Sequence, residues 1–322
     1  MLPSGYAAVA CMPGSRCARA RRQHFIRKGN HILLARVLAG VVGIPLLVVV
    51  LFAGDGLLFA AVACSVGLIG VQEMYRGVAG HTPARPVGWV GWLGVAMAFA
   101  AARCWAVGAP TWWVTPAFTG LLMVALVSQL SPSRRAPVRD LGPTVLGAVY
   151  VGALLPYLVL LRGTDSPAAA GIFHWHSAGA RAVLFAFVVA WAGDTAAYFV
   201  GRGLGKHKLC PTLSPGKTVE GLVGGMVAAA AAGELTGPWL LRLVASYPVS
   251  SGLALHGLLL GVAAGLLGPA GDLCKSAMKR ELGIKDFGGL IPGHGGVLDR
   301  FDSVMFVSPA VFYYCAYVLG TR

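Results

Sequence analysis

The stretch AVLFAFVVAWAGDTAAYFV, residues 182–200, decides the class of fold. It contains one charged side chain, Asp194, among residues that are otherwise apolar, small or weakly polar. A helix needs about 20 predominantly apolar residues to cross the hydrocarbon core of a bilayer. The stretch therefore predicts a membrane-spanning helix. Because an ionisable group inside such a helix is costly, Asp194 is a candidate functional residue, with a purely structural hydrogen-bonding carboxylate as the alternative.

Eight other segments have the same apolar character, at 32–53, 57–72, 87–107, 114–130, 142–161, 219–236, 253–270 and 303–319. The whole chain is 57% hydrophobic and 12% charged, whereas soluble domains carry about 25% charged residues. The apolar runs are continuous instead of alternating with period two, which disfavours a β-barrel. The sequence thus predicts an all-α, polytopic integral membrane protein with about nine transmembrane helices, and excludes a water-soluble globule.

The distribution of basic residues predicts the orientation. With the N-terminus placed in the cytoplasm, 20 of the 26 Lys and Arg residues lie in inner segments and five in outer segments. Such a bias is typical of a multi-pass protein of the cell (inner) membrane, whose cytoplasmic loops are rich in Lys and Arg. The net charge of +14 fits contact with anionic membrane lipids, or binding of an anionic substrate. Nucleic-acid binding is not expected, because no polar domain carries the bases.

Three regions follow from this pattern. Residues 1–31 form a basic cytoplasmic tail without any acidic residue, expected to be disordered in part. Residues 32–180 contain the N-terminal transmembrane helices, and residues 181–322 form a C-terminal transmembrane region that holds the candidate catalytic residues. Glu73, at the inner end of the second apolar segment, is expected to be a solvated helix end.

The scarce acidic residues gather in one inner segment. Five of the twelve lie within residues 271–302, together with five bases and the glycine-rich sequence PGHGG at 292–296. Mg²⁺ binds one or two carboxylates together with phosphate oxygens and water, while Lys and Arg neutralise the remaining phosphate charge. Glycines let backbone N–H groups approach an anion closely. The mixture predicts a metal–phosphate site at the inner face. Asp299 and Asp302, spaced i,i+3, either reach one site or serve only as N-terminal helix charges.

A second inner segment opens the seventh apolar segment with Ser214-Pro-Gly-Lys217-Thr218-Val-Glu-Gly221. Its Gly-Lys-Thr is similar to a nucleotide-binding P-loop, but Pro211 stands where the first glycine is required and no buried strand precedes it, so a P-loop is excluded. A phosphate-binding helix start remains. The alternative is an ordinary helix N-terminus, with Thr218 as N-cap and Gly221 at N3.

Residues 271–302 resemble the signature of the phosphatidate cytidylyltransferase (CDP-diacylglycerol synthase) family. The signature residues present are Ser276, Lys279, Arg280, Lys285, Asp286, Gly288, Pro292, Gly293, His294, Gly295, Gly296, Asp299, Arg300 and Asp302. The segments around Ser214 and Asp194 also resemble the family, in the same order. The resemblance covers residues 191–302, and the first 180 residues carry no diagnostic motif.

The resemblance implies a reaction in which phosphatidic acid and CTP give CDP-diacylglycerol and pyrophosphate at the inner membrane face. Its nucleophile, a phosphate oxygen, is already ionised at neutral pH, so no strong general base is needed. Catalysis should therefore consist mainly of positioning and charge neutralisation. The resemblance also implies two Mg²⁺ ions, with a monovalent cation as a further candidate, and a homodimer.

Residue roles are assigned as hypotheses on the same basis. Asp272 and Asp299 are the expected metal ligands, supported by Asp302 and Asp194. The expected catalytic or phosphate-binding groups are Ser214, Lys217, Thr218, Ser276, Lys279, Arg280, Lys285, His294, Gly295, Gly296 and Arg300. One alternative is a cytidylyltransferase for another lipid phosphate. A membrane transporter is the alternative of a different class, but no internal repeat is evident and the acids cluster at one face instead of the midplane.

Overall fold

The computed structural model describes residues 41–131, 136–164, 175–244, 252–288 and 295–320. Its first helix is Val41–Phe52. The helices that follow are α2 (Leu57–His81), α3 (Gly88–Ala106), α4 (Val114–Val127), α5 (Pro137–Leu154), α6 (Tyr157–Arg162), α7 (Ala178–Gly203), α8 (Val219–Leu240), α9 (Leu253–Glu281) and α10 (Leu298–Tyr317). The short 3-10 helix η1 (Ser128–Leu130) continues α4, and two strands, β1 (Lys208–Cys210) and β2 (Ser214–Thr218), form a hairpin before α8.

The predicted all-α membrane architecture is confirmed. Within the described ranges, six helical segments are long and apolar enough to cross a membrane, and two shorter apolar helices accompany them. Helix α10 also coincides with a predicted apolar segment, but its first five residues include Asp299, Arg300 and Asp302. Each of the nine predicted segments overlaps helical residues in the described part of the chain, and the segment 142–161 covers both α5 and α6.

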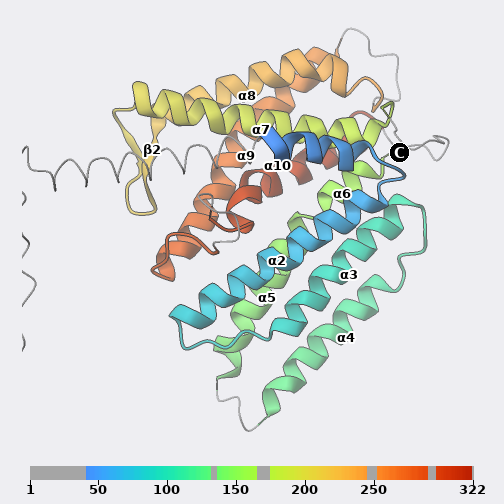
Figure 1. The fold of residues 1–322 in the computed structure, drawn as a ribbon, viewed down its shortest axis with the longest axis vertical. Coiled ribbons are helices and arrows are strands. Elements are labelled where there is room, and N and C mark those ends of the chain that lie inside the picture. The colour runs from blue at the N-terminus through green and yellow to red at the C-terminus, as the bar shows by residue number, and fades with distance from the viewer. Residues whose placement is uncertain (1–40, 132–135, 165–174, 245–251, 289–294, 321–322) are drawn as a thin grey trace, which may run out of the picture.

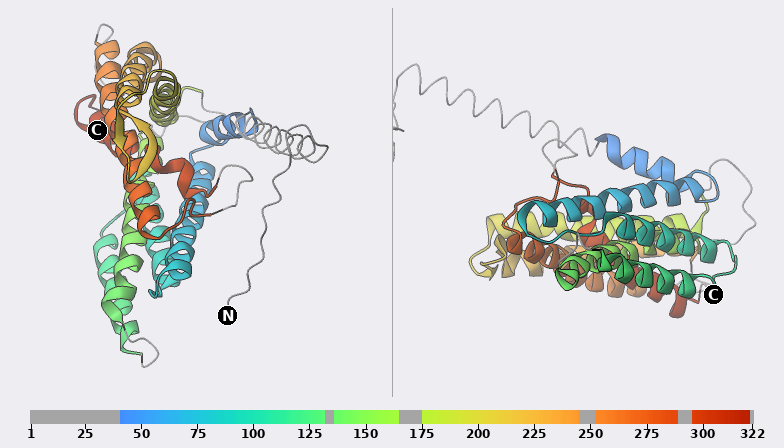
Figure 2. Two further views of the ribbon diagram at one scale, coloured as in Figure 1. Left: turned by 90° about the vertical axis from the view of Figure 1, so that its left-hand side faces the viewer. Right: turned by 90° about the horizontal axis from the view of Figure 1, so that it is seen from below.

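The helices form two neighbouring groups (Figure 1). Helices α2–α5 lie side by side, and the two further views keep them together (Figure 2). Helices α7, α8 and α9 form the second group, with α10 packed against α9. Residues of both groups belong to one buried apolar core, which includes Val71 of α2, Val95 of α3 and Phe185 of α7. This continuous core positions the N-terminal helices against the region that carries the candidate site.

Small residues set the close approach of α8 to α9. A Cβ atom added at Gly233 would overlap the backbone of Gly257, and one added at Gly257 would overlap Gly233 in turn. One turn away, Gly261 lies against the backbone of Ala229. In a bilayer, helices associate through such van der Waals contact, because lipid tails are as apolar as the side chains themselves. The glycines thus bring the backbone of α8 next to α9.

Tyr75 joins α2 to α3 and α5. Its hydroxyl donates a 2.5 Å hydrogen bond to the carbonyl of Thr144. The ring fits between Gly91 and Gly147, where any Cβ would collide with it. The Thr144 hydroxyl in turn accepts a hydrogen bond from the Val87 N–H at 2.8 Å. A buried polar network of this kind fixes the relative rotation of the three helices.

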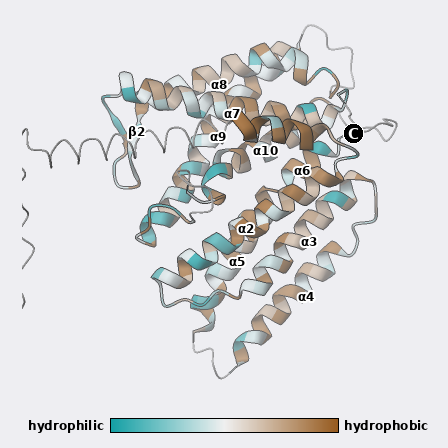
Figure 3. Cartoon of the chain, viewed as in Figure 1, coloured by the Kyte–Doolittle hydropathy of each residue, from teal (hydrophilic) through white to brown (hydrophobic). Residues whose placement is uncertain are grey.

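Polar residues concentrate at one end of the molecule. Hydropathy colouring marks the hairpin and the C-terminal end of α9 as hydrophilic, whereas the helices between the two ends are mainly apolar (Figure 3). Helix α9 continues to Glu281, eleven residues past the predicted apolar segment that ends at 270. Asp272 and Ser276 consequently lie on a helix and not in a loop, which fixes their spacing around the site.

Candidate active site

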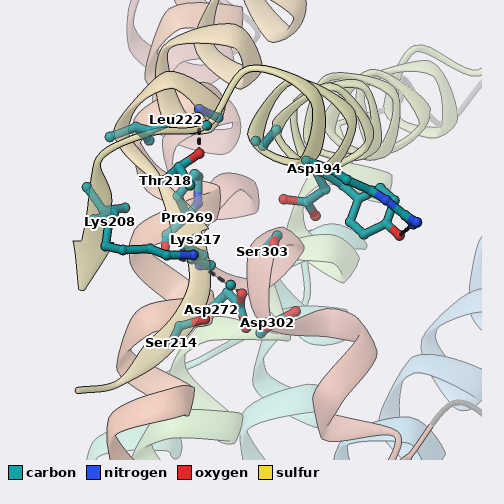
Figure 4. Close-up of a pocket in the computed structure, with 18 of the residues that line it drawn as sticks. Asp194, Lys208, Ser214, Lys217, Thr218, Leu222, Pro269, Asp272, Asp302 and Ser303 are labelled. Carbon is teal, nitrogen blue, oxygen red and sulfur yellow. Dashed lines mark hydrogen bonds and ion pairs between the residues drawn. The ribbon is translucent and has the colours of Figure 1, made fainter. Parts of the chain in front are cut away.

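A cavity of about 730 Å³ lies at the hydrophilic end, between α7, the hairpin, α8, α9 and α10 (Figure 4). Its size is typical of small-molecule sites. Seven of the residues predicted from the sequence line it, namely Asp194, Ser214, Lys217, Thr218, Asp272, Asp299 and Asp302. The fold therefore brings together carboxylates and bases from segments up to about a hundred residues apart.

Lys275 forms the centre of the charged cluster. Its side chain is 5% exposed, and its ammonium makes ion pairs with Asp272 at 3.1 Å, with Asp299 at 3.5 Å and with Asp302. The ammonium also donates to the backbone carbonyl of Asp299 at 3.3 Å. Lys275 is one of the five bases of residues 271–302, and no role was predicted for it from the sequence. Its position three residues after Asp272 on one helix was the available signal, because i,i+3 residues share a helix face.

Asp299 is held from several sides. One carboxylate oxygen accepts from the ammonium of Lys279 at 2.8 Å. The other accepts from the backbone N–H groups of Phe287 at 3.1 Å and Gly296 at 3.3 Å. The side chain is only 5% exposed. Asp299 thus ties the start of α10 both to α9 and to the segment that contains the glycine-rich sequence.

Asp272 lies at the edge of the cluster and is more open, with 32% of its side chain exposed. Its second oxygen pairs with the Lys217 ammonium at 2.8 Å, and Lys217 also donates to the carbonyl of Pro269 at 3.3 Å. These contacts attach the hairpin to α9. The carboxyl groups of Asp272 and Asp302 lie next to each other at the cavity wall (Figure 4).

Thr218 caps α8, as in the alternative that the sequence left open for this segment. Its hydroxyl accepts from the N–H of Gly221 at 3.1 Å. Thr218 is also the last residue of β2 and pairs with Lys208 across the hairpin. The N-terminus of α8, with its positive dipole end, opens beside the cavity that Thr218 and Gly221 both line. Asp194 of α7 faces the same cavity and lies beside Ser303 of α10 (Figure 4).

Other predicted residues lie outside the cavity lining. Lys279 forms an ion pair with Asp299, and Ser276 is buried. The Arg280 guanidinium donates to the carbonyl of Leu213 at 3.1 Å, which supports the hairpin. Lys285 and Arg300 are exposed, and Gly295 and Gly296 flank the start of α10. Gly295 has φ of +79°, a conformation that favours glycine. His294 lies outside the described residues.

Glu73 is buried, so the prediction of a solvated helix end is wrong. Its exposed fraction is 6%. Its two carboxylate oxygens accept from the N–H groups of Val297 and Leu298, each at 3.1 Å. The first backbone N–H groups of a helix have no acceptor within the helix. Glu73 supplies acceptors for two of these groups at the start of α10. No local sequence pattern connects residues separated by more than 220 positions.

The carboxylates suit a hard cation. Asp272 and Asp302 lie side by side, and Asp194 faces the same space. In the part of the chain that the structure describes, no three His, Cys, Asp or Glu side chains are arranged to hold a metal ion alone. Mg²⁺ usually takes only one or two carboxylates where phosphates and water complete its shell. The donor set therefore fits Mg²⁺ that binds together with a nucleotide.

Comparison with known proteins gives a family relationship. Residues 34–318 match the sequence model of the cytidylyltransferase family. A phosphatidate cytidylyltransferase of Bacillus subtilis is 39% identical over 177 residues, which make up 55% of this chain and 59% of that protein.

Two further relatives extend the comparison. A phosphatidate cytidylyltransferase of Staphylococcus saprophyticus is 44% identical over 138 residues, 43% of this chain and 50% of that protein. The uncharacterized protein YnbB of Escherichia coli is 43% identical over 142 residues, 43% of this chain and 45% of that protein. The chain spans about half the length of the curated relatives it matches.

Proposed function

Because the chain belongs to the cytidylyltransferase family, we propose that it transfers CMP from CTP to phosphatidic acid, giving CDP-diacylglycerol and pyrophosphate. The observation that carries the proposal is the convergence of Asp272, Asp299 and Asp302 with Lys217 and Lys275 at one cavity. Two relatives named phosphatidate cytidylyltransferase support the choice of substrates. Transfer of a nucleotide between two polyanions needs this mixture of cations and carboxylates.

In the proposed reaction, a phosphate oxygen of phosphatidic acid attacks the α-phosphorus of CTP. The bond from that phosphorus to the oxygen that bridges the α- and β-phosphates breaks, and pyrophosphate leaves with its electron pair. No proton must be removed from an ionised phosphate. The chain therefore has to align the two substrates and offset their repulsion, which is the role we assign to Lys217 and to the N-terminus of α8.

Mg²⁺ is the proposed cofactor. Asp272 and Asp194 line the cavity and offer carboxylates for it, and Asp302 lies next to Asp272. When bound, the ion would neutralise phosphate charge and orient the triphosphate. Lys279 and the backbone N–H groups of Phe287 and Gly296 hold Asp299 in place, so we assign Asp299 to shaping the site.

We further propose that the protein resides in the cell membrane with its cavity at the cytoplasmic face, where CTP is available. The cavity lies at the hydrophilic end of the helices (Figure 3). Arg202 and Lys208 line it, and a concentration of bases on one side agrees with a cytoplasmic location. A homodimer stays a prediction from the family resemblance.

The decisive experiment is a direct assay. Purified protein in detergent receives CTP labelled at the α-phosphorus, phosphatidic acid and Mg²⁺, and the label that enters the lipid phase is counted. We expect lipid-soluble label that requires all three components. An absence of transfer at every Mg²⁺ concentration would refute the proposal. The Asp272→Asn variant is the matched control for a contaminating enzyme, because it should elute as folded protein without activity.

The same assay separates the nearest alternative. Polyprenyl phosphates and ether-linked phosphatidic acid replace the diacyl substrate one at a time, at equal surface concentration. A higher kcat/KM for one of them would reassign the lipid substrate and keep the reaction type. Proteoliposomes that move a labelled solute without forming labelled lipid would instead favour a transporter.

A further inference from the structure

Lys275 occupies an unusual position for a lysine in a site that handles polyphosphates. It is 4% exposed, and three carboxylates surround its ammonium. An ammonium that only bound substrate phosphate would be exposed and free of the protein's own carboxylates. Here the side chain instead neutralises the protein's own acids. A buried charge is tolerated only when it is closely paired and hydrogen-bonded. Lys217 and Lys279 each pair with one carboxylate of the cluster, whereas Lys275 pairs with all three.

The carboxylates differ in how open they are. The side chains of Asp299 and Asp302 are 5% and 9% exposed, whereas that of Asp272 is 32% exposed. Both oxygens of Asp299 already accept hydrogen bonds, from Lys279 and from backbone N–H groups. A metal ion bound by Asp299 would have to displace these donors.

From this geometry we propose that Lys275 is a built-in cation of the site, which takes the place of a second metal ion, so that the chain binds a single Mg²⁺ with its nucleotide. The inference rests on the proposed function. Two cations held by the same carboxylates repel each other at short range, and the ammonium lies where Asp272, Asp299 and Asp302 meet. Asp272 pairs with Lys217 and Lys275 but is the most exposed of the three carboxylates, so it and Asp194 are the donors we assign to the one ion.

The number of metal ions bound per chain tests this inference. Full-length protein in detergent is dialysed to equilibrium against Mn²⁺ and α,β-methylene CTP, an analogue whose α–β linkage resists cleavage, and bound metal is measured per chain. We expect one Mn²⁺ for the wild type. Lys275→Met removes the ammonium at similar side-chain length and should raise the count to two. Lys275→Arg keeps the charge and should stay at one.

Lys206→Met is the matched control, because it removes the same charge from an exposed lysine outside the cavity lining. The Lys206→Met variant should still bind one Mn²⁺ per chain. Two ions bound by the wild type would overturn the inference, as would an unchanged count in Lys275→Met. Failure of Lys275→Met to fold at any Mn²⁺ concentration would also overturn it, since a metal could then not replace the ammonium. A variant that folds only with Mn²⁺ supports it.

The same experiment distinguishes failure of the proposed role of Lys275 from failure of the proposed nucleotide site. If the wild type binds the CTP analogue together with two Mn²⁺, only the role of Lys275 is refuted. If the wild type binds neither analogue nor metal, the proposed nucleotide site itself is refuted, and the inference is refuted with it.

Discussion

Removal of the Glu73 carboxylate should destabilise the whole helical assembly. Glu73 lies on α2, yet both of its oxygens accept hydrogen bonds from the first turn of α10, at Val297 and Leu298. The side chain also contacts Gly288 and Gly296, where an added Cβ would collide with it. Glu73→Ala thus breaks two hydrogen bonds and leaves two buried N–H groups without their acceptor.

The magnitude follows from these two bonds. A hydrogen bond to a charged group contributes about 1.5–3 kcal/mol to stability, so Glu73→Ala should lower the free energy of unfolding by about 3–6 kcal/mol. With an unfolding entropy of roughly 2.1 cal/mol/K per residue, a chain of 322 residues changes its Tm by about 1.5 °C for each kcal/mol. The expected loss is therefore roughly 4–9 °C. Glu73→Gln keeps one acceptor oxygen and should lose about half as much.

Thermal unfolding in detergent, followed by size-exclusion chromatography of the heated samples, measures these shifts. Gln72→Ala is the control, since Gln72 is the neighbour on α2 and makes a single exposed bond, from the Trp92 indole N–H at 2.9 Å. We expect the order wild type, Gln72→Ala, Glu73→Gln, Glu73→Ala in decreasing Tm. A Tm for Glu73→Ala within 1 °C of Gln72→Ala would refute the reasoning.

Three further outcomes are expected. Asp272→Asn should abolish lipid labelling while the protein elutes as wild type, and near-wild-type activity would exclude Asp272 as a required metal ligand. Thr218→Ala should cost about 1 kcal/mol of stability through loss of the α8 cap, and Thr218→Ser should restore most of it; equal Tm values for the two variants would contradict this. Gly233→Leu should prevent recovery of folded protein, because its side chain meets the α9 backbone, whereas Gly120→Leu has open space around it and should fold; equal yields would disprove the close contact.

The sequence predicted the helices and much of the site. Continuous apolar runs locate helices well, because the bilayer imposes a nearly fixed length on each. The segments around Asp194, Lys217 and Asp272 do converge on one cavity. The Thr218 cap was also predictable, since its bond to Gly221 depends on residues three apart.

Two features were missed for different physical reasons. Hydropathy ended the predicted segment 253–270 at residue 270, but residues 271–281 are rich in good helix formers such as Leu, Ala, Met, Lys and Arg, and α9 continues through them to Glu281. With that helix extended, Lys275 would have appeared on the same face as Asp272. Glu73 is different, because its burial depends on the packing of α2 against α10 and no local pattern encodes that contact.

These two missed residues explain how the start of α10 is positioned. Lys275 and Lys279 of α9 bind Asp299 and Asp302 from one side. Glu73 of α2 binds the first turn of the same helix from the other side. The two attachments thus come from different groups of helices. The geometry of the proposed catalytic carboxylates therefore depends on helices whose own sequence carries no catalytic motif, and changes on α2 should alter activity as well as stability.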